Sequence, residues 1–170
     1  EYGDKDTFAI LVLFPIPEKE LDNLKTIFGI SDLSINGGAV AWTTTPWTIP
    51  ANQALNVNPN AEYAIFKTEA NSHNIDWLIL ATNLRDELKE KIPYIGEPIG
   101  KVPGKKLKNL RFSHPLMKLG GTYAREAACI DAEYVDLESG TGIVHCAPAH
   151  GLEDFISYKD GGFSNLPILN

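Results

Sequence analysis

Residues 42–52 read Trp-Thr-Thr-Thr-Pro-Trp-Thr-Ile-Pro-Ala-Asn, and this stretch lies between two short apolar runs, 39–42 and 54–57. It gathers four threonine hydroxyls, two indoles and the carboxamide of Asn52 within eleven residues. Pro46 and Pro50 each lack a backbone N–H donor and disfavour helical geometry in the residue before them. The sequence therefore predicts a strand that ends in a stiff, kinked loop, which presents its hydroxyls to a ligand from a rigid scaffold.

The composition is that of an ordinary globular chain. Of the 170 residues, 44% are hydrophobic and 22% are charged, which argues against disorder and predicts one domain with a sizeable core. The formal net charge of −7 provides no chain-wide basic footprint, so any contact with a polyanion would have to be local. Two cysteines do not make a disulfide framework, and no segment is long and apolar enough to span a bilayer. The chain begins at Glu1 without a signal-like leader, which we interpret as a piece of a longer protein.

Short apolar runs separated by glycine and proline make up most of the remaining chain. They predict strands over residues 8–14, 39–43, 54–57, 62–68, 75–80, 95–102, 107–112, 127–135 and 143–146. One-sided apolar patterns predict helices over residues 18–28, 83–91 and 152–158. We expect strand 8–14 to be buried on both faces, and strands 54–57 and 62–68 to pair through the turn 58–60. Many short strands and few helices favour a mainly β fold, a distorted closed β-barrel with two or three peripheral α-helices.

A second polar cluster occupies residues 145–154, which read His-Cys-Ala-Pro-Ala-His-Gly-Leu-Glu-Asp. His145 is expected at the end of a strand, and Asp154 falls in the first turn of the predicted helix that follows. The positive end of the helix dipole favours the ionised form of a carboxylate at this position. An ionised aspartate that faces a cleft is a natural receptor for an ammonium group.

Other chemistries fit these residues less well. Cys146, His150 and Asp154 could ligate zinc, but no Cys-x-x-Cys or His-x-x-x-His pair accompanies them, so we predict no metal. A Cys–His nucleophile would need an exposed, activated thiolate, whereas Cys146 ends an apolar strand and is expected to be a small core residue. The sequence contains no Gly-x-Ser-x-Gly elbow, no Walker loop and no Gly-x-Gly-x-x-Gly.

Residues 42–52 together with residues 140–154, Gly-Thr-Gly-Ile-Val-His-Cys-Ala-Pro-Ala-His-Gly-Leu-Glu-Asp, closely resemble the editing (CP1) domain of isoleucyl-tRNA synthetase. The resemblance extends to residues 1–5, to Pro59 and to residues 110–115, and it covers essentially the whole chain. Leucyl and valyl enzymes carry Thr-Thr-Arg-Pro where this chain has Thr45 before Pro46, which indicates the isoleucyl branch. The sequence of residues 145–151 is similar to that of the bacterial and mitochondrial type of this enzyme.

The resemblance implies post-transfer editing, the hydrolysis of valine wrongly esterified to isoleucine tRNA, with some hydrolysis of valyl-adenylate. A pocket that accepts isoleucine cannot strongly reject valine, and isoleucyl-tRNA synthetase is itself the standard illustration of this limit and of the second, smaller editing site. By resemblance, Asp154 binds the α-ammonium of the misattached valine. His145 forms the wall that excludes the extra methylene of isoleucine.

The resemblance also implies roles for the residues of the first segment. Thr43, Thr44, Thr45 and Thr48 contact the aminoacyl group and help to order the attacking water. Asn52 assists substrate binding, and Trp47 lines the pocket or contacts the terminal adenosine. An aminoacyl ester is already activated, so water placement and polar stabilisation could suffice without a metal or a covalent nucleophile.

The expected partners are the 3′ acceptor end of isoleucine tRNA carrying valine and the rest of the synthetase chain, in a bacterial cytoplasm or a mitochondrial matrix. No cofactor is expected, because ATP would serve only the synthetic part and the chain contains neither His-Ile-Gly-His nor Lys-Met-Ser-Lys-Ser. The alternatives are a non-catalytic module that binds the acceptor end and a stand-alone trans-editing deacylase. For the basic run over residues 101–111, we favour a solvated face over a contact with tRNA phosphates. His73 and His114, which are expected in polar turns, are assigned no role.

Overall fold

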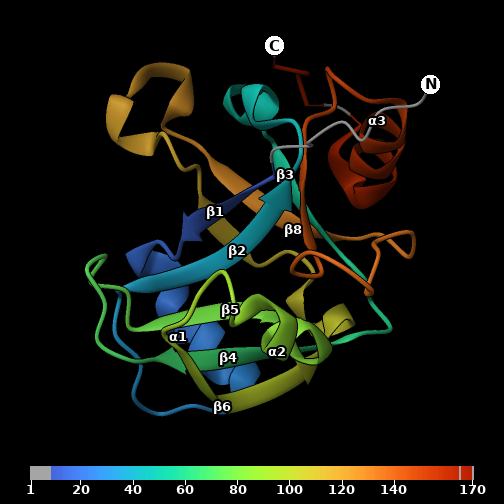
Figure 1. Ribbon diagram of the computed structural model, residues 1–170. Coiled ribbons are helices and arrows are strands. Elements are labelled where there is room, and N and C mark those ends of the chain that lie inside the picture. Colours follow the sequence, from blue (N-terminus) through green and yellow to red (C-terminus); the bar gives the residue numbers. More distant parts are fainter. Residues whose placement is uncertain (1–8, 165, 170) are drawn as a thin grey trace, which may run out of the picture.

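The computed structural model describes residues 9–164 and 166–169, and these residues form nine β-strands and three α-helices (Figure 1). The strands are β1 (Ile10–Pro15), β2 (Gly37–Thr43), β3 (Ala54–Val57), β4 (Glu62–Thr68), β5 (Trp77–Ala81), β6 (Ile95–Pro103), β7 (Arg111–Ser113), β8 (Glu126–Asp131) and β9 (Ile143–Cys146). The α-helices are α1 (Glu18–Phe28), α2 (Arg85–Leu88) and α3 (Leu152–Tyr158). Short 3-10 turns occupy Pro46–Ala51, Thr82–Leu84, Gly104–Leu107, Met117–Leu119 and Gly121–Tyr123, and a kinked π turn, Lys159–Phe163, follows α3. None of the described helices is long and apolar enough to cross a membrane.

The strands form two mixed sheets. The first sheet has the order β1-β2-β5-β4-β6 and the second has the order β7-β8-β3-β9. Pairing is antiparallel except between β2 and β5 and between β3 and β8, which run parallel. Among the described residues neither sheet closes on itself, because β1, β6, β7 and β9 remain at the sheet ends. The prediction of a mainly β fold with two or three peripheral helices is therefore confirmed, and the closed barrel is not.

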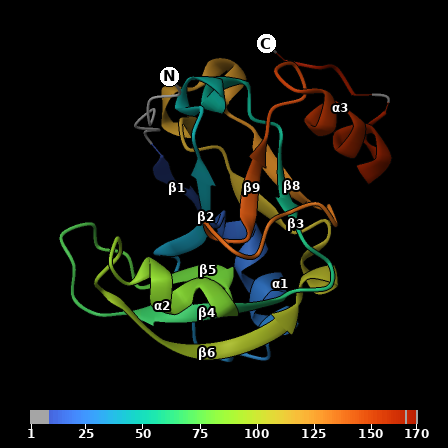
Figure 2. The same cartoon turned by 45° about the vertical axis from the view of Figure 1, so that its right-hand side comes forward.

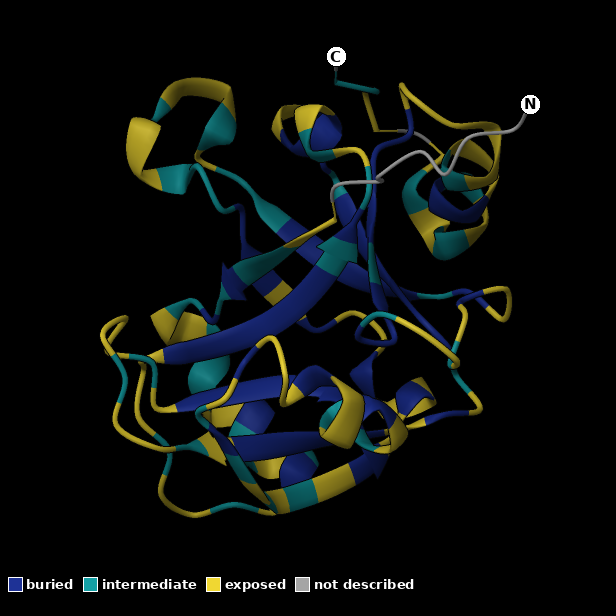
Figure 3. Ribbon diagram, in the orientation of Figure 1, coloured by how far each residue is buried: buried dark blue, intermediate teal, exposed yellow. Residues whose placement is uncertain are grey.

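One apolar core is shared by the two sheets. It includes Trp77 and Ile79 of the first sheet together with Leu55 and Phe112 of the second, all of them almost completely buried. The central strands of both sheets are buried, whereas β6 and many of the connecting loops are largely exposed (Figure 3). A smaller cluster, which contains Tyr158, attaches α3 to the other face of the second sheet. Strands β2 and β9 contact each other and bring the two sheets together (Figure 2).

Helix α1 shows how local sequence sets an element. Acidic side chains occupy its first turn and Lys25 its last, which matches the helix dipole. Gly29 ends the helix in the left-handed conformation, with φ of 66°, and its N–H donates to the carbonyls of Lys25 and Thr26. Leu24 and Phe28 are buried on the face toward the core. The predicted bounds of this helix are confirmed.

Several local predictions were wrong. Strand β1 is half-buried rather than buried on both faces, because it forms the edge of its sheet and pairs only with β2. Strands β3 and β4 do not pair, since the turn at 58–60 carries the chain from one sheet to the other. The predicted helix 83–91 is shortened to a 3-10 turn and the four-residue α2. The predicted strand 107–112 begins only at Arg111, because Asn109 adopts a positive φ of 68°. Residues 1–5, which carry part of the resemblance, lie outside the described residues.

Candidate active site

The two polar segments meet in one pocket. Its volume is about 240 Å³, and its walls come from residues 42–48 on one side and 144–154 on the other. The lining residues are Trp42, Thr43, Thr44, Thr45, Thr48, Val144, His145, Ala147, His150 and Asp154. Strands β2 and β9, which lead into these segments, lie side by side (Figure 2). The pocket therefore forms where the two sheets contact each other.

The threonine segment, residues 43–48, leaves the end of β2 and enters a short 3-10 helix, Pro46–Ala51, where the sequence predicted a stiff, kinked loop. Pro46 is tolerated because it is the first residue of the helix, where no intrahelical N–H bond is required. The Thr43 hydroxyl accepts a hydrogen bond of 3.0 Å from the N–H of Thr45 and lies 3.4 Å from the Thr45 hydroxyl. The Thr45 and Thr48 hydroxyls are 3.5 Å apart. Three of the predicted hydroxyls thus form a row along one wall of the pocket.

His145 is fixed between the threonine segment and Asn52. The carboxamide nitrogen of Asn52 donates to the Ala54 carbonyl at 2.9 Å and lies 3.3 Å from Nδ1 of His145. Because the amide nitrogen is a donor, we assign Nδ1 as the acceptor and Nε2 as the protonated atom. Nε2 then donates to the Thr48 hydroxyl at 2.9 Å, and this hydroxyl donates to the Thr45 carbonyl at 2.9 Å. Burial lowers the pKa of His145 to about 4, so the imidazole is neutral at physiological pH.

Asp154 contributes a carboxylate to the pocket. It lies in the first turn of α3, and its Oδ2 accepts a hydrogen bond of 2.9 Å from the N–H of Ala147 in the loop before the helix. Partial burial raises the pKa of Asp154, while the Ala147 hydrogen bond opposes this shift. Ionisation therefore costs more here than at the protein surface, and a cation in the pocket would relieve that cost.

Two predicted substrate contacts are not part of the pocket wall. Trp47 points away from the core with 73% of its surface exposed, whereas Asn52 is fully buried behind His145. Asn52 contacts the wall residue, and Trp47 is accessible only outside the pocket. Trp42, at the end of the apolar run 39–42, is half-buried and lines the pocket.

The thiol of Cys146 is buried beneath the site. It donates to the Asp154 carbonyl at 3.4 Å, and burial raises its pKa to about 12. A thiol with this pKa is almost entirely protonated at neutral pH and is a poor nucleophile. The expectation that Cys146 is a small core residue is confirmed.

Two residues that support the site were missed in the sequence. His114 is 1% exposed, although a polar turn was expected, and its side chain contacts the Ile49 carbonyl. Arg125 contacts the carbonyls of Pro50 and Asn52. Both residues lie more than sixty positions after the 3-10 helix that they hold, so no local pattern connects them with it.

The neutral state of His145 predicts a pH-dependent stability. The unfolded imidazole takes up a proton near pH 6.5, whereas the folded one does so near pH 4. Between these values the unfolded state binds more protons, so the free energy of unfolding falls as the pH decreases, by up to about 3 kcal/mol. Chemical denaturation at about pH 7 and about pH 4.5 should therefore show a smaller loss for His145→Gln than for the wild type. Equal losses would contradict a neutral buried His145; the exposed His150→Gln variant is the control.

No protein-family model matches the chain. The isoleucine–tRNA ligases of Bordetella petrii and Paraburkholderia xenovorans are each 44% identical to it over 171 residues, which cover 100% of this chain. The same alignments cover 18% and 17% of those two proteins, so the chain spans about one sixth of the length of the curated relatives that it matches.

Solved structures show the same fold. The crystal structure of GlLeuRS-CP1 gives a TM-score of 0.71 at 17% identity and covers 94% of this chain and 62% of that one. The editing domain of the P. knowlesi cytosolic leucyl-tRNA synthetase gives 0.66 at 16% identity, with 89% and 62% covered. The chain is thus related along its whole length to a segment of bacterial isoleucine–tRNA ligases, and its fold is that of leucyl-tRNA synthetase editing domains.

Proposed function

We propose that residues 1–170 of this chain form a single editing domain that belongs to a larger class I aminoacyl-tRNA synthetase. The domain would hydrolyse the ester bond of valine wrongly attached to isoleucine tRNA. The observation that carries the proposal is the single pocket in which the threonine row, His145 and Asp154 meet. The relationship to isoleucine–tRNA ligases supports the choice of tRNA, and the fold supports editing in general.

Asp154 would bind the α-ammonium of the misattached amino acid. Its carboxylate is the acidic group of the pocket, and one of its oxygens is already hydrogen-bonded to Ala147. A charge-assisted hydrogen bond to an ammonium would compensate the cost of keeping this partly buried carboxylate ionised. The site would therefore select an amino acid ester over an ester that lacks the amino group.

The reaction needs only water and polar groups. A water molecule attacks the ester carbonyl carbon, the bond to the ribose oxygen breaks, and the ribose oxygen takes up a proton. The hydroxyls of Thr43, Thr44 and Thr45 would orient the water and donate to the developing oxyanion. The buried, protonated thiol of Cys146 provides no alternative nucleophile.

His145 would set the size limit of the site. Its ring is 5% exposed and is held from both sides, by Thr48 and by Asn52, so it cannot turn away to admit a larger side chain. Asn52 would thus act on the substrate through His145. Trp47, which is exposed outside the pocket, would contact the terminal adenosine.

The partners would be the acceptor end of isoleucine tRNA and the rest of the synthetase, in the bacterial cytoplasm, since the relatives described above are bacterial. ATP would be used only by the synthetic part of that larger enzyme. With 15 basic and 22 acidic side chains, this chain would rely on the other domains for most of its contacts with the tRNA phosphates.

Incubation of the 170-residue chain with valyl- and isoleucyl-tRNA tests the proposal. We expect release of valine well above the spontaneous rate and little release of isoleucine. Binding of the acceptor end without release would identify a non-catalytic module instead, and hydrolysis of both esters at equal rates would contradict the proposed selectivity.

A further inference from the structure

We propose that His114 and Arg125 form a clamp that positions the threonine segment and, through Asn52, the His145 wall of the pocket. Neither residue lines the pocket, so both act as positioning residues. The expected effect of the clamp on the rate of hydrolysis rests on the proposed function. Its expected effect on the orientation and tautomer of His145 does not depend on that function.

The two clamp residues are paired with each other. His114 follows β7 and Arg125 precedes β8, and the N–H of His114 donates to the Arg125 carbonyl at 3.0 Å. The chain between them leaves this paired base as a projecting loop, the gold segment that leads into β8 in Figure 1. Tyr123 of this loop packs on both side chains, with its ring 5.5 Å from the His114 ring and 5.8 Å from the Arg125 guanidinium carbon. The base of the loop therefore presents the imidazole and the guanidinium as one unit.

This unit binds the carboxyl end of the 3-10 helix Pro46–Ala51. Nδ1 of His114 accepts a hydrogen bond of 3.0 Å from the N–H of Leu116, so Nε2 carries the hydrogen and donates to the Ile49 carbonyl at 3.0 Å. The guanidinium of Arg125 donates to the Asn52 carbonyl through Nε at 3.0 Å and through Nη2 at 2.8 Å. Nη2 also donates to the Pro50 carbonyl.

A 3-10 helix of six residues containing Pro50 cannot satisfy all three of these carbonyls, those of Ile49, Pro50 and Asn52, from its own backbone. The only backbone donor to them among the hydrogen bonds of the described turns is the N–H of Asn52, which bonds to Ile49. The planar fork of an arginine matches two neighbouring carbonyls, whereas a lysine ammonium lacks this fixed geometry. The end of the 3-10 helix is thus oriented by two side chains that lie next to β7 and β8 of the second sheet.

Asn52 connects the clamp with the pocket. Its carbonyl is held by Arg125, and its carboxamide contacts Nδ1 of His145. Thr48, four residues earlier, contacts the other nitrogen of the same ring. A shift of the helix end would therefore move both partners that fix the tautomer and the orientation of His145. A displacement of about 1 Å in such a site reduces turnover by up to about 100-fold.

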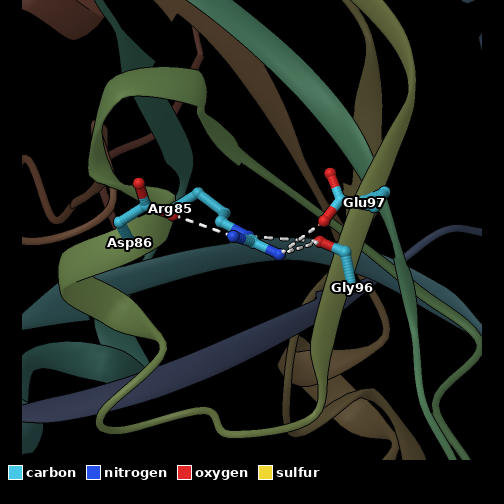
Figure 4. Close-up of polar contacts among 4 residues, drawn as sticks. All are labelled: Arg85, Asp86, Gly96 and Glu97. Atoms are coloured by element: carbon cyan, nitrogen blue, oxygen red, sulfur yellow. Dashed lines mark hydrogen bonds and ion pairs between the residues drawn. The ribbon is translucent and has the colours of Figure 1, made fainter.

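The test uses the complete 170-residue chain with Arg125→Met, Arg125→Lys and His114→Gln, and with Arg85→Met as the matched control. Arg85 makes the same kind of bond, since Nε and Nη2 donate to the Gly96 carbonyl at 3.2 and 3.0 Å (Figure 4). It also pairs with Asp86 and Glu97, but its partners belong to α2 and β6 and not to the pocket.

We expect Arg125→Met to lower kcat for valyl-tRNA hydrolysis about 10- to 100-fold while KM changes less than about threefold. Arg125→Lys should recover part of this loss, and Arg85→Met should leave kcat unchanged. The ring nitrogens of His145, followed by ¹⁵N NMR, should report one neutral tautomer protonated at Nε2 in the wild type and in Arg85→Met. In Arg125→Met and His114→Gln we expect mixed tautomers and titration at a higher pH.

A folded Arg125→Met chain with wild-type kcat and an unchanged His145 spectrum would overturn the inference. If Arg125→Met does not fold, Arg125→Lys and His114→Gln decide by the same two readouts. If even the wild-type chain releases no amino acid, the proposed function fails, and the His145 spectra still decide whether the clamp positions the wall.

Discussion

Replacement of Asp154 by asparagine is expected to reduce kcat/KM for valyl-tRNA about 100- to 1,000-fold, because Asp154 is the one carboxylate among the described residues that line the pocket, and the α-ammonium loses it as an acceptor. Asparagine keeps the shape of the side chain and an oxygen that can accept the Ala147 N–H. The substitution thus removes the charge with little change in the packing of α3. Single-turnover deacylation with excess enzyme measures the effect.

The stability of this variant separates function from folding. Burial raises the pKa of Asp154 in the folded chain, so the ionised carboxylate is less favourable there than in the unfolded chain at neutral pH. Asp154→Asn should therefore be at least as stable as the wild type near pH 7. Glu153→Gln, which removes an exposed carboxylate one position earlier on the same helix, is the matched control and should keep full activity. Retained hydrolysis in Asp154→Asn would exclude Asp154 as the ammonium receptor.

Replacement of His145 by alanine is expected to let the site hydrolyse isoleucyl-tRNA. Removing the imidazole opens the wall at the position where Thr48 and Asn52 now hold it rigidly. A pocket with space for one more methylene gains about 1–3 kcal/mol for the larger side chain, which corresponds to roughly a 10- to 200-fold change in selectivity. The ratio of kcat/KM values for the valyl and isoleucyl esters is the quantity to measure.

His150→Ala is the control for this experiment. His150 also lines the pocket, but it is exposed, and its side chain makes no hydrogen bond with the described residues. His150→Ala should therefore leave the ratio of the two kcat/KM values unchanged. His145→Ala also removes a partner of the buried Asn52 and should lower the melting temperature. If His145→Ala remains folded and keeps the wild-type ratio, His145 is not the wall that excludes isoleucine.

Local signals in the sequence were sufficient for several elements. The bounds of α1, α3, β3, β4 and β9 are as predicted, because each has a clear apolar pattern and most of them have glycine, proline or asparagine at or near an end. Such local patterns could not show that the two polar segments, which are far apart in the sequence, lie close together in the fold. Their resemblance to a known domain supplied that expectation, and the shared pocket agrees with it.

What the sequence could not reveal depends on long-range contacts. The turn at 58–60 shows that the chain changes direction, but not that β3 and β4 belong to different sheets. Strand β1 has the composition of a buried strand, yet it is at a sheet edge. In the sequence His114 resembles any histidine in a polar turn, and its contacts with the Ile49 carbonyl and the Tyr123 ring are seen only in the structure.

The central claim is that Asp154 and the threonine segment together receive the amino end of an aminoacyl ester. The most direct test is a crystal structure of the chain with a non-hydrolysable amide analogue of valyl-adenosine. We predict that the valyl ammonium lies about 3 Å from the Asp154 carboxylate, with the isopropyl group against His145 and the carbonyl beside the threonine hydroxyls. An analogue bound with its ammonium turned away from Asp154, or bound outside this pocket, would contradict the account.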